Sequence, residues 1–317
     1  MSLKNNLGLL VEALRGPRAA RREHNRNLGS PATIESGLAL LRARWPDLKS
    51  PDQSAPVFIF SAGWRSGSTF LQRWVMTGNN ILVWGEPYCH SGLIPSLAGQ
   101  LKAFTPRWPQ DEFFAAYHED GGEDLTQGWV ANLYPAMSDF MNAHIGYFER
   151  LFLEPALALG RTRWGLKEVT LRVEHACYLR WLFPNARFLF LYRDPYRAYA
   201  SYRRWRGWYR SWPDEPVFTA AHFGALWKQS TTDFLENHSK VGGLLLRYEE
   251  LRTQSTKERL EHYLGVLLAD PSSLARVDGA GAADRRYSRS HWIPKPEAFL
   301  LRRKVEPVSR RLGYPGR

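Results

Sequence analysis

The stretch that decides the fold is VFIFSAGWRSGSTFL, residues 57–71. It begins with an apolar run of strand character, passes through a loop of glycine and hydroxyl residues, and ends in a helical pattern. In such a unit the loop N–H groups converge on an anion, and the helix dipole adds about half a positive charge. Gly63 and Gly67 let a ligand approach the backbone, because neither residue carries a Cβ. The stretch predicts a phosphate-binding loop, although a Gly/Ser turn before a helix has the same composition.

The loop differs from the one that binds nucleoside triphosphates. That motif reads GxxxxGK[ST]. Aligned on Gly67, the chain has Ala62 in place of the first glycine and Ser68 in place of the lysine. Arg65 lies inside the loop instead, and its planar guanidinium suits a phosphate-like group. A P-loop kinase-like phosphotransferase remains an alternative, but the missing lysine argues against it.

Composition and charge limit the class of protein. The chain has 317 residues and a net charge of +12, from 43 Lys and Arg against 31 Asp and Glu. This balance suits nucleic acid, a membrane surface or a polyanionic small molecule. A basic nucleic-acid binder without enzymatic activity is therefore a second alternative, although the chain contains no nucleic-acid reading motif. Cys89 and Cys177 form neither a disulfide framework nor a zinc pattern, and no apolar run could span a bilayer. We expect a soluble cytoplasmic protein of bacterial origin.

Periodicity predicts the organisation of the chain. We expect residues 1–50 to form a basic arm followed by a helix, and residues 51–317 to form an α/β domain. Apolar runs between amphipathic helices predict a central parallel sheet flanked by helices. The predicted strands are residues 57–60, 81–84, 163–167 and 187–192, and residues 243–251 are predicted to be a further strand that runs into a helix. The aromatic-rich residues 91–160 are predicted to be a helical insertion that recognises the acceptor, with helices over 110–119 and 125–159 and a kink near Pro135.

Two motifs resemble one enzyme family. AGWRSGST, residues 62–69, resembles the 5′-phosphosulfate loop of sulfotransferases that use 3′-phosphoadenosine 5′-phosphosulfate, in the form found in the carbohydrate, tyrosylprotein and bacterial branches. RDPYRAYASYR, residues 193–203, resembles the segment of that family that binds the 3′-phosphate, with Arg193 at a strand end and Ser201 in the following helix. Such an arginine is also a common ion-pair partner of an aspartate, but here it follows the loop in the order of the family.

The resemblance covers residues 56–315 and implies a P-loop-containing, sulfotransferase-like α/β fold. It implies transfer of a sulfuryl group from 3′-phosphoadenosine 5′-phosphosulfate to an acceptor hydroxyl or amine. The segment at Tyr248 looks like the Tyr-Glu-Asp-Leu segment of the family, and a plain strand end is its structural alternative. The residues implied in donor binding are Arg65, Ser66, Gly67, Ser68, Thr69, Arg193, Ser201, Tyr248, Arg285 and Arg286.

The resemblance also implies catalytic roles. Arg65 would stabilise the leaving oxygen and Lys167 the sulfuryl oxygens. Glu86 would be the general base, because tyrosylprotein and some bacterial members have a glutamate after the second strand; His90 is the reserve candidate. Glu86 could instead be a turn residue before a proline, and Lys167 could be a solvated lysine at the end of a strand. No metal is expected, since arginine and lysine supply the cations. We expect a small-molecule or glycan acceptor, which could be a sugar, a phenol or a natural product, and the oligomeric state stays open.

Overall fold

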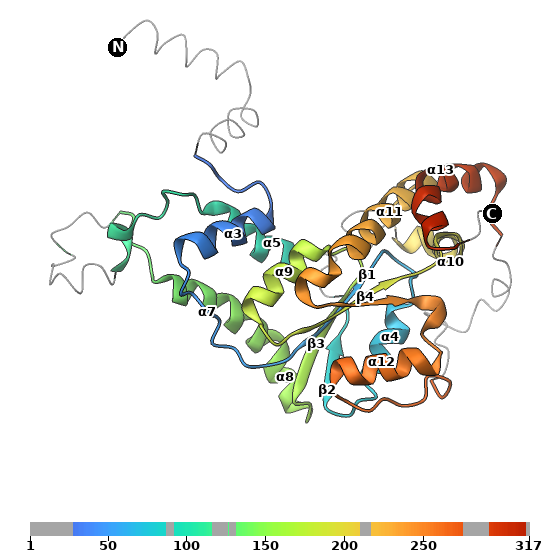
Figure 1. Ribbon diagram of the computed structural model, residues 1–317, viewed down its shortest axis with the longest axis horizontal. Helices are drawn as coiled ribbons and strands as arrows, with labels where there is room; N and C mark the ends of the chain where they lie inside the picture. Colours follow the sequence, from blue (N-terminus) through green and yellow to red (C-terminus); the bar gives the residue numbers. More distant parts are fainter. Residues whose placement is uncertain are drawn as a thin grey trace, which may run out of the picture. The chain divides into compact units, whose positions relative to one another are not determined.

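The structure is a computed structural model of the chain (Figure 1). It describes residues 28–86, 92–115, 126, 131–209, 217–274 and 292–314, without the side chains of 205–209. The chain forms two compact units. The smaller unit takes its described residues from Met1–Lys49 and Pro95–Ala143, and the larger one from Ser50–Ile94 and His144–Arg317.

The larger unit is built on a five-stranded sheet with the order β2-β3-β1-β4-β5. All of its strand pairs are parallel, which confirms the predicted parallel α/β fold. The three middle strands are almost wholly buried, which explains their near-continuous apolar sequences. The strands are β1 (Val57–Ser61), β2 (Ile81–Trp84), β3 (Arg163–Glu168), β4 (Arg187–Tyr192) and β5 (Leu244–Arg247).

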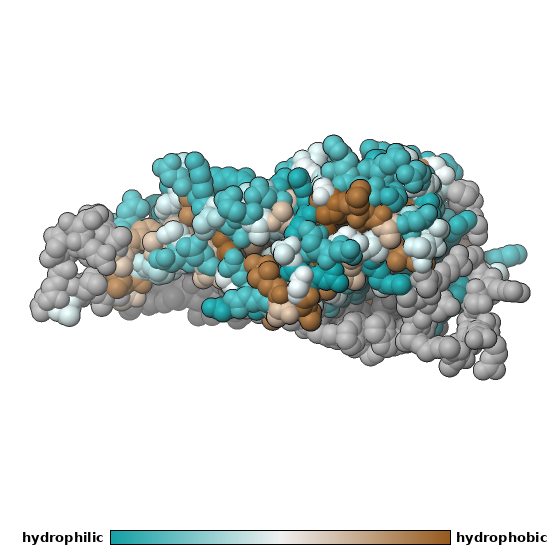
Figure 2. Space-filling view, turned by 90° about the horizontal axis from the view of Figure 1, so that it is seen from below, coloured by the Kyte–Doolittle hydropathy of each residue, from teal (hydrophilic) through white to brown (hydrophobic). Residues whose placement is uncertain are grey.

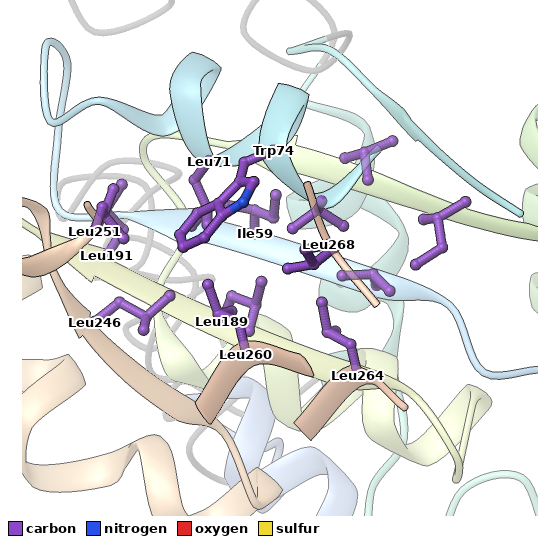
Figure 3. Packing of buried hydrophobic residues seen from close by; sticks show 14 residues of the cluster. Ile59, Leu71, Trp74, Leu189, Leu191, Leu246, Leu251, Leu260, Leu264 and Leu268 are labelled. Atoms are coloured by element: carbon purple, nitrogen blue, oxygen red, sulfur yellow. The ribbon is translucent and has the colours of Figure 1, made fainter. Parts of the chain in front are cut away.

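Helices cover both faces of this sheet (Figure 1). Helices α4 and α12 cover one face, where Ile59 and Leu189 of the sheet pack with Leu71, Trp74 and Leu260 of these helices (Figure 3). Since side chains alternate along a strand, the neighbouring residues face the other way. The helices of the larger unit are α4 (Ser68–Val75), α8 (Glu154–Ala158), α9 (Val173–Leu182), α10 (Pro195–Tyr209), α11 (Ala220–Asn237), α12 (Gln254–Leu264) and α13 (Lys295–Arg311).

Aromatic rings fill the opposite face of the sheet. Phe58 of β1 lies edge-on to Trp164 of β3, with their ring centroids 5.6 Å apart. Phe190 of β4 contacts Phe234 of α11 at 5.0 Å, and Phe58 also contacts Phe183 at the end of α9. Edge-to-face and tilted pairs of this kind stabilise a core beyond the area that they bury.

The strand order creates a switch point between β1 and β4. The chain leaves β1 through α4 toward β2, on one side, and leaves β4 toward β5, on the other. In open α/β sheets, ligands bind at such a point, outside the carboxyl ends of the strands. The loop at residues 62–67 follows β1 there, and Arg193 follows β4.

The smaller unit contains α3 (Ile34–Arg44) and the short 3-10 turns Gln100–Ala103 and Asp111–Phe113. Helix α3 lies close to the first of these turns, because a Cβ on Gly37 would be only 2.9 Å from the Leu101 carbonyl oxygen. Arg44, in the last turn of α3, donates hydrogen bonds to the carbonyl oxygens of Thr105 and Trp108. Two of the three boundaries between the units lie within helices α5 (Leu93–Gly99) and α7 (Met137–Phe148).

The helical prediction for residues 110–119 and 125–159 is wrong in part. Residues 131–136 form no helix, and α7 begins at Met137, after Pro135 instead of with a kink at it. The backbone of Tyr134 is used otherwise: its N–H donates to the Phe113 carbonyl (2.6 Å), and its carbonyl accepts from Ala115 N–H (3.0 Å). These bonds also keep residues 110–114 out of an α-helix.

The surface view in Figure 2 shows mainly hydrophilic residues with smaller hydrophobic areas between them. Among the described helices, none combines the length and the apolar character that a membrane span requires.

Candidate active site

The loop between β1 and α4 has an unusual backbone. Gly63 has φ = +113°, Arg65 has φ = +64° and Gly67 has φ = +91°. Glycine adopts such values freely, whereas the left-handed conformation costs a residue such as arginine about 1–2 kcal/mol. The Ser66 hydroxyl donates a hydrogen bond to the Gly63 carbonyl at 2.7 Å and closes the loop on itself. Non-glycine residues in this conformation occur preferentially at functional sites.

Helix α4 starts directly from this loop. Its N-cap is Gly67, which has no side chain that could accept a hydrogen bond from the first N–H groups. No acidic residue lies in its first turn. The uncapped N–H groups and the helix dipole make this end suited to an anion. Ser68 is buried and Thr69 is exposed, so two hydroxyl residues lie at the same helix end.

Arg193, at the end of β4, contacts the loop directly. Its Nη1 donates a hydrogen bond to the backbone carbonyl of Arg65 at 2.8 Å. Its Nε is buried and has no hydrogen-bond partner within the described part of the chain. Burial lowers the pKa of Arg193, while Tyr248 and Glu249 act in the opposite direction. A desolvated guanidinium with a spare donor is a good group for an anionic ligand.

Ser201 joins the second motif to the same loop. Its hydroxyl accepts a hydrogen bond from Nε of Arg65 at 3.0 Å. Helix α10, which carries Ser201, is capped by Asp194, whose Oδ1 accepts from the N–H groups of Tyr196 and Arg197. The two motifs, more than a hundred residues apart in the chain, therefore form one cluster.

Tyr248, just after β5, completes this cluster. A Cβ on Gly67 would lie 2.2 Å from the Tyr248 ring, so the ring packs directly on the loop backbone. The Arg193 guanidinium lies 4.1 Å from the centroid of the same ring, within cation–π range. Two features therefore require glycine at position 67: the positive φ of its backbone and the close approach of the Tyr248 ring.

Glu86 and Lys167 form an ion pair at the same edge of the sheet. Glu86 follows β2, and the ammonium of Lys167 in β3 donates to its carboxylate Oε1. The side chain of Lys167 is 6% exposed and that of Glu86 is 23% exposed, so the acid keeps some access to solvent. In the sheet, Lys167 pairs with Ile59 of β1, the strand that precedes the loop at residues 62–67.

The structure brings seven described candidates to one edge of the sheet: Arg65, Gly67, Arg193, Ser201, Tyr248, Glu86 and Lys167. Ser66, Ser68 and Thr69 lie in or next to the loop. The predicted residues His90, Arg285 and Arg286 lie outside the described residues. Glu249 was missed by sequence reasoning; its carboxylate accepts the backbone N–H of Asp194 at 3.1 Å. The sequence feature that could have identified Glu249 is its position next to Tyr248, in the segment that resembles the Tyr-Glu-Asp-Leu segment of the family.

Comparison with known proteins assigns the class. The sequence model of the sulfotransferase family matches residues 56–270. The chain belongs to the sulfotransferase family, and membership supports sulfotransfer as its activity. A search of curated proteins found no match.

Solved structures that resemble the chain include three sulfotransferases. The sulfotransferase domain from the curacin biosynthetic pathway has 17% identity and a TM-score of 0.46, covering 83% of this chain and 99% of that one. The sulfotransferase domain of the Synechococcus PCC 7002 olefin synthase has 20% identity and a TM-score of 0.44, covering 85% and 99%. Sulfotransferase STF9 from Mycobacterium avium has 14% identity and a TM-score of 0.43, covering 89% and 83%.

Proposed function

We propose that the chain transfers a sulfuryl group from 3′-phosphoadenosine 5′-phosphosulfate to the hydroxyl of a small-molecule or glycan acceptor. The observation that carries this proposal is the direct contact between the two anion-binding motifs. Arg193 bonds to the Arg65 carbonyl, and Arg65 bonds to Ser201. A donor with phosphates on both its 5′ and 3′ oxygens matches two adjacent anion-binding groups better than a single phosphate does.

Each part of the donor has a candidate partner. The N–H groups of residues 66–69, with the hydroxyls of Ser68 and Thr69, would hold the 5′-phosphate at the uncapped end of α4. Arg193 and Ser201 would hold the 3′-phosphate, for which Arg193 has a buried donor without a partner within the described chain. The ring of Tyr248 would lie near the nucleotide. Arg285 and Arg286 are further candidates for the 3′-phosphate.

The reaction would be an in-line displacement at sulfur, related to phosphoryl transfer. The acceptor oxygen forms a bond to sulfur, and the bond from sulfur to the bridging oxygen of the 5′-phosphate breaks. The electron pair of that bond goes to the leaving oxygen, where Arg65 would stabilise the growing negative charge. The acceptor proton would pass to Glu86, and 3′-phosphoadenosine 5′-phosphate would leave.

The ion pair between Lys167 and Glu86 suits these two roles. The ammonium of Lys167 holds the Glu86 carboxylate in place, and this carboxylate is the proposed acceptor of the proton. When Glu86 takes the proton, its attraction for Lys167 weakens, and the ammonium is then available to the sulfuryl oxygens. His90 is the reserve base. That no metal takes part stays a prediction.

The two rival functions differ from this one in their ligands. A P-loop kinase-like phosphotransferase would bind ATP with Mg²⁺, but Ser68 occupies the position of its lysine. A nucleic-acid binder would retain DNA in a salt-dependent way. We would measure the thermal stability of the protein with 3′-phosphoadenosine 5′-phosphate, with ATP and Mg²⁺, and with duplex DNA.

We expect the melting temperature to rise with the 3′,5′-bisphosphate and with neither rival ligand. A rise with ATP and Mg²⁺ alone would favour the kinase. Release of 3′-phosphoadenosine 5′-phosphate from the sulfated donor, measured across sugar, phenol and peptide acceptors, would then identify the acceptor class.

A further inference from the structure

Helix α13 lies outside the region that matches the family, which ends at residue 270, yet this helix and the residues after it contact neighbours of Arg193 and Ser201 at two places. It packs on α11, where Leu301 and Val305 approach Gly224 so closely that a Cβ there would lie 3.1–3.2 Å from them. Figure 1 shows α13 beside α11 and α10. The helix thus packs on α11 and lies beside α10, the element that carries Ser201.

The first contact is at the C-terminal end of α13. After the helix, Tyr314 turns back, and its hydroxyl donates to Oε2 of Glu249 at 2.9 Å. Oε1 of the same carboxylate accepts the backbone N–H of Asp194 at 3.1 Å, the peptide unit that follows Arg193. Tyr314 is 4% exposed, and the Arg247 guanidinium lies over its ring, 4.3 Å from the ring centroid. Glu249 therefore links the C-terminal segment to the backbone that aims Arg193.

The second contact is near the N-terminal end of α13. The carboxylate of Glu297 accepts from the Tyr199 hydroxyl at 2.8 Å and pairs with Arg203 at 2.5 Å. Tyr199 and Arg203 are four residues apart and share one face of α10. Ser201, midway between them, is about 200° away around the helix and so lies on the opposite face. Glu297 holds α10 from behind while Ser201 faces Arg65.

We infer that α13 and Tyr314 position Arg193 and Ser201 for the 3′-phosphate, so that a segment outside the family-matched region sets the affinity for the donor nucleotide; the inference rests on the proposed function. Neither Tyr314 nor Glu297 touches the nucleotide in this scheme. Each acts through another residue, Tyr314 through Glu249 and Glu297 through α10. Their effect is therefore specific to the 3′-phosphate.

The test compares two ligands that differ in that phosphate. We would measure dissociation constants of 3′-phosphoadenosine 5′-phosphate and adenosine 5′-monophosphate by calorimetry for the wild type and for the variants Tyr314→Phe and Glu297→Gln. Each variant removes one indirect hydrogen bond or ion pair, so we expect affinity for the bisphosphate to fall about fivefold. Affinity for the monophosphate should not change.

Two control variants separate positioning from a general loss of stability. Tyr263→Phe removes a hydroxyl that bonds to the backbone of Gly242 and of Phe188, which lies at the other end of β4 from Arg193. Glu306→Gln removes ion pairs with Arg302 and Arg310 on α13 itself and leaves the bonds of Glu297 and Tyr314 in place. Both controls should keep wild-type affinity for both ligands.

The outcomes distinguish this inference from the proposed function. Wild-type affinity for the bisphosphate in both Tyr314→Phe and Glu297→Gln would overturn the inference and leave the proposed function standing. Equal losses for both ligands would also overturn it, because a general distortion does not select the 3′-phosphate. A wild type that binds the bisphosphate no better than the monophosphate would overturn both.

Discussion

The guanidinium of Arg193 donates to the backbone carbonyl of Arg65, with 2.8 Å between Nη1 and the oxygen. The bond joins a strand end to the middle of a strained loop, and the partner is a peptide group instead of a side chain. The position of Arg193 therefore depends on the conformation of the loop, and not on which side chain residue 65 carries. A hydrogen bond to the backbone therefore connects the loop to the second anion-binding motif.

Replacing Arg193 should weaken nucleotide binding. Arg193→Ala removes a charge-assisted interaction with the 3′-phosphate, so we expect a loss on the order of 1.5–3 kcal/mol in binding 3′-phosphoadenosine 5′-phosphate. Isothermal calorimetry measures it. Arg187→Ala, at the exposed start of the same strand, is the matched control and should bind normally. Unchanged affinity in Arg193→Ala would remove the second motif from the donor site.

Replacing Glu86 should separate catalysis from binding. General-base catalysis contributes about 10²–10⁴ in rate, so Glu86→Ala should reduce turnover by that factor or abolish it. The same variant should still bind 3′-phosphoadenosine 5′-phosphate, because the groups proposed to hold its two phosphates are the loop N–H groups, Arg193 and Ser201. Turnover close to that of the wild type would move the base role to His90, and His90→Asn is the parallel variant to measure.

Two glycine variants test the packing of Tyr248 on the loop. Both Gly63→Ala and Gly67→Ala place a Cβ on a residue with positive φ. Only Gly67→Ala also meets the Tyr248 ring, at 2.2 Å, since nothing lies within 4 Å of a Cβ on Gly63. We expect Gly67→Ala to lower the free energy of unfolding by about 1–3 kcal/mol more than Gly63→Ala does. Chemical denaturation measures the difference, and equal losses would contradict this packing.

A buried histidine should make stability depend on pH. His144 is 4% exposed, and its Nδ1 lies 2.6 Å from the Tyr178 hydroxyl. Burial lowers the pKa of His144 to about 4, from 6.5 in an unfolded chain. The unfolded state therefore takes up a proton first as pH falls. The stabilisation is complete above pH 6.5 and is lost between pH 6.5 and 4, up to about 3 kcal/mol.

His144→Asn keeps a polar atom near the position of Nδ1 but removes the titrating group. Urea unfolding at several pH values should show a shallower loss of stability between pH 6.5 and 4 in this variant than in the wild type. Parallel pH profiles for the two proteins would show that His144 contributes nothing to the pH dependence.

Much of the larger unit could be predicted from local sequence. The predicted strands over 81–84 and 187–192 match β2 and β4 residue for residue, because short apolar runs between turn signals specify buried strands. The predicted helix after Arg193, which carries Ser201, is α10; it begins at Pro195, since proline suits the first turn. For residues 110–114 and 131–136 the helical prediction failed, because the bonds of Tyr134 to residues distant in sequence replace helical ones.

The candidate site was predictable as a set of residues but not as a set of contacts. The motifs marked Arg65 and Arg193, yet no local pattern shows that one binds the carbonyl of the other. The pairing of Glu86 with Lys167 follows from β2 and β3 being neighbours, and strand order is set by the whole chain. No local sequence pattern marked Tyr314, because its partner Glu249 lies 65 positions away in the chain.

The left-handed backbone of Arg65 sets two selective pressures against each other. Glycine at this position would relieve the conformational cost and make the folded state more stable, so screening for heat resistance alone would favour it. The same exchange would discard the guanidinium that is proposed to meet the departing oxygen. Selection for stability would therefore favour glycine at position 65, whereas selection for turnover would favour arginine.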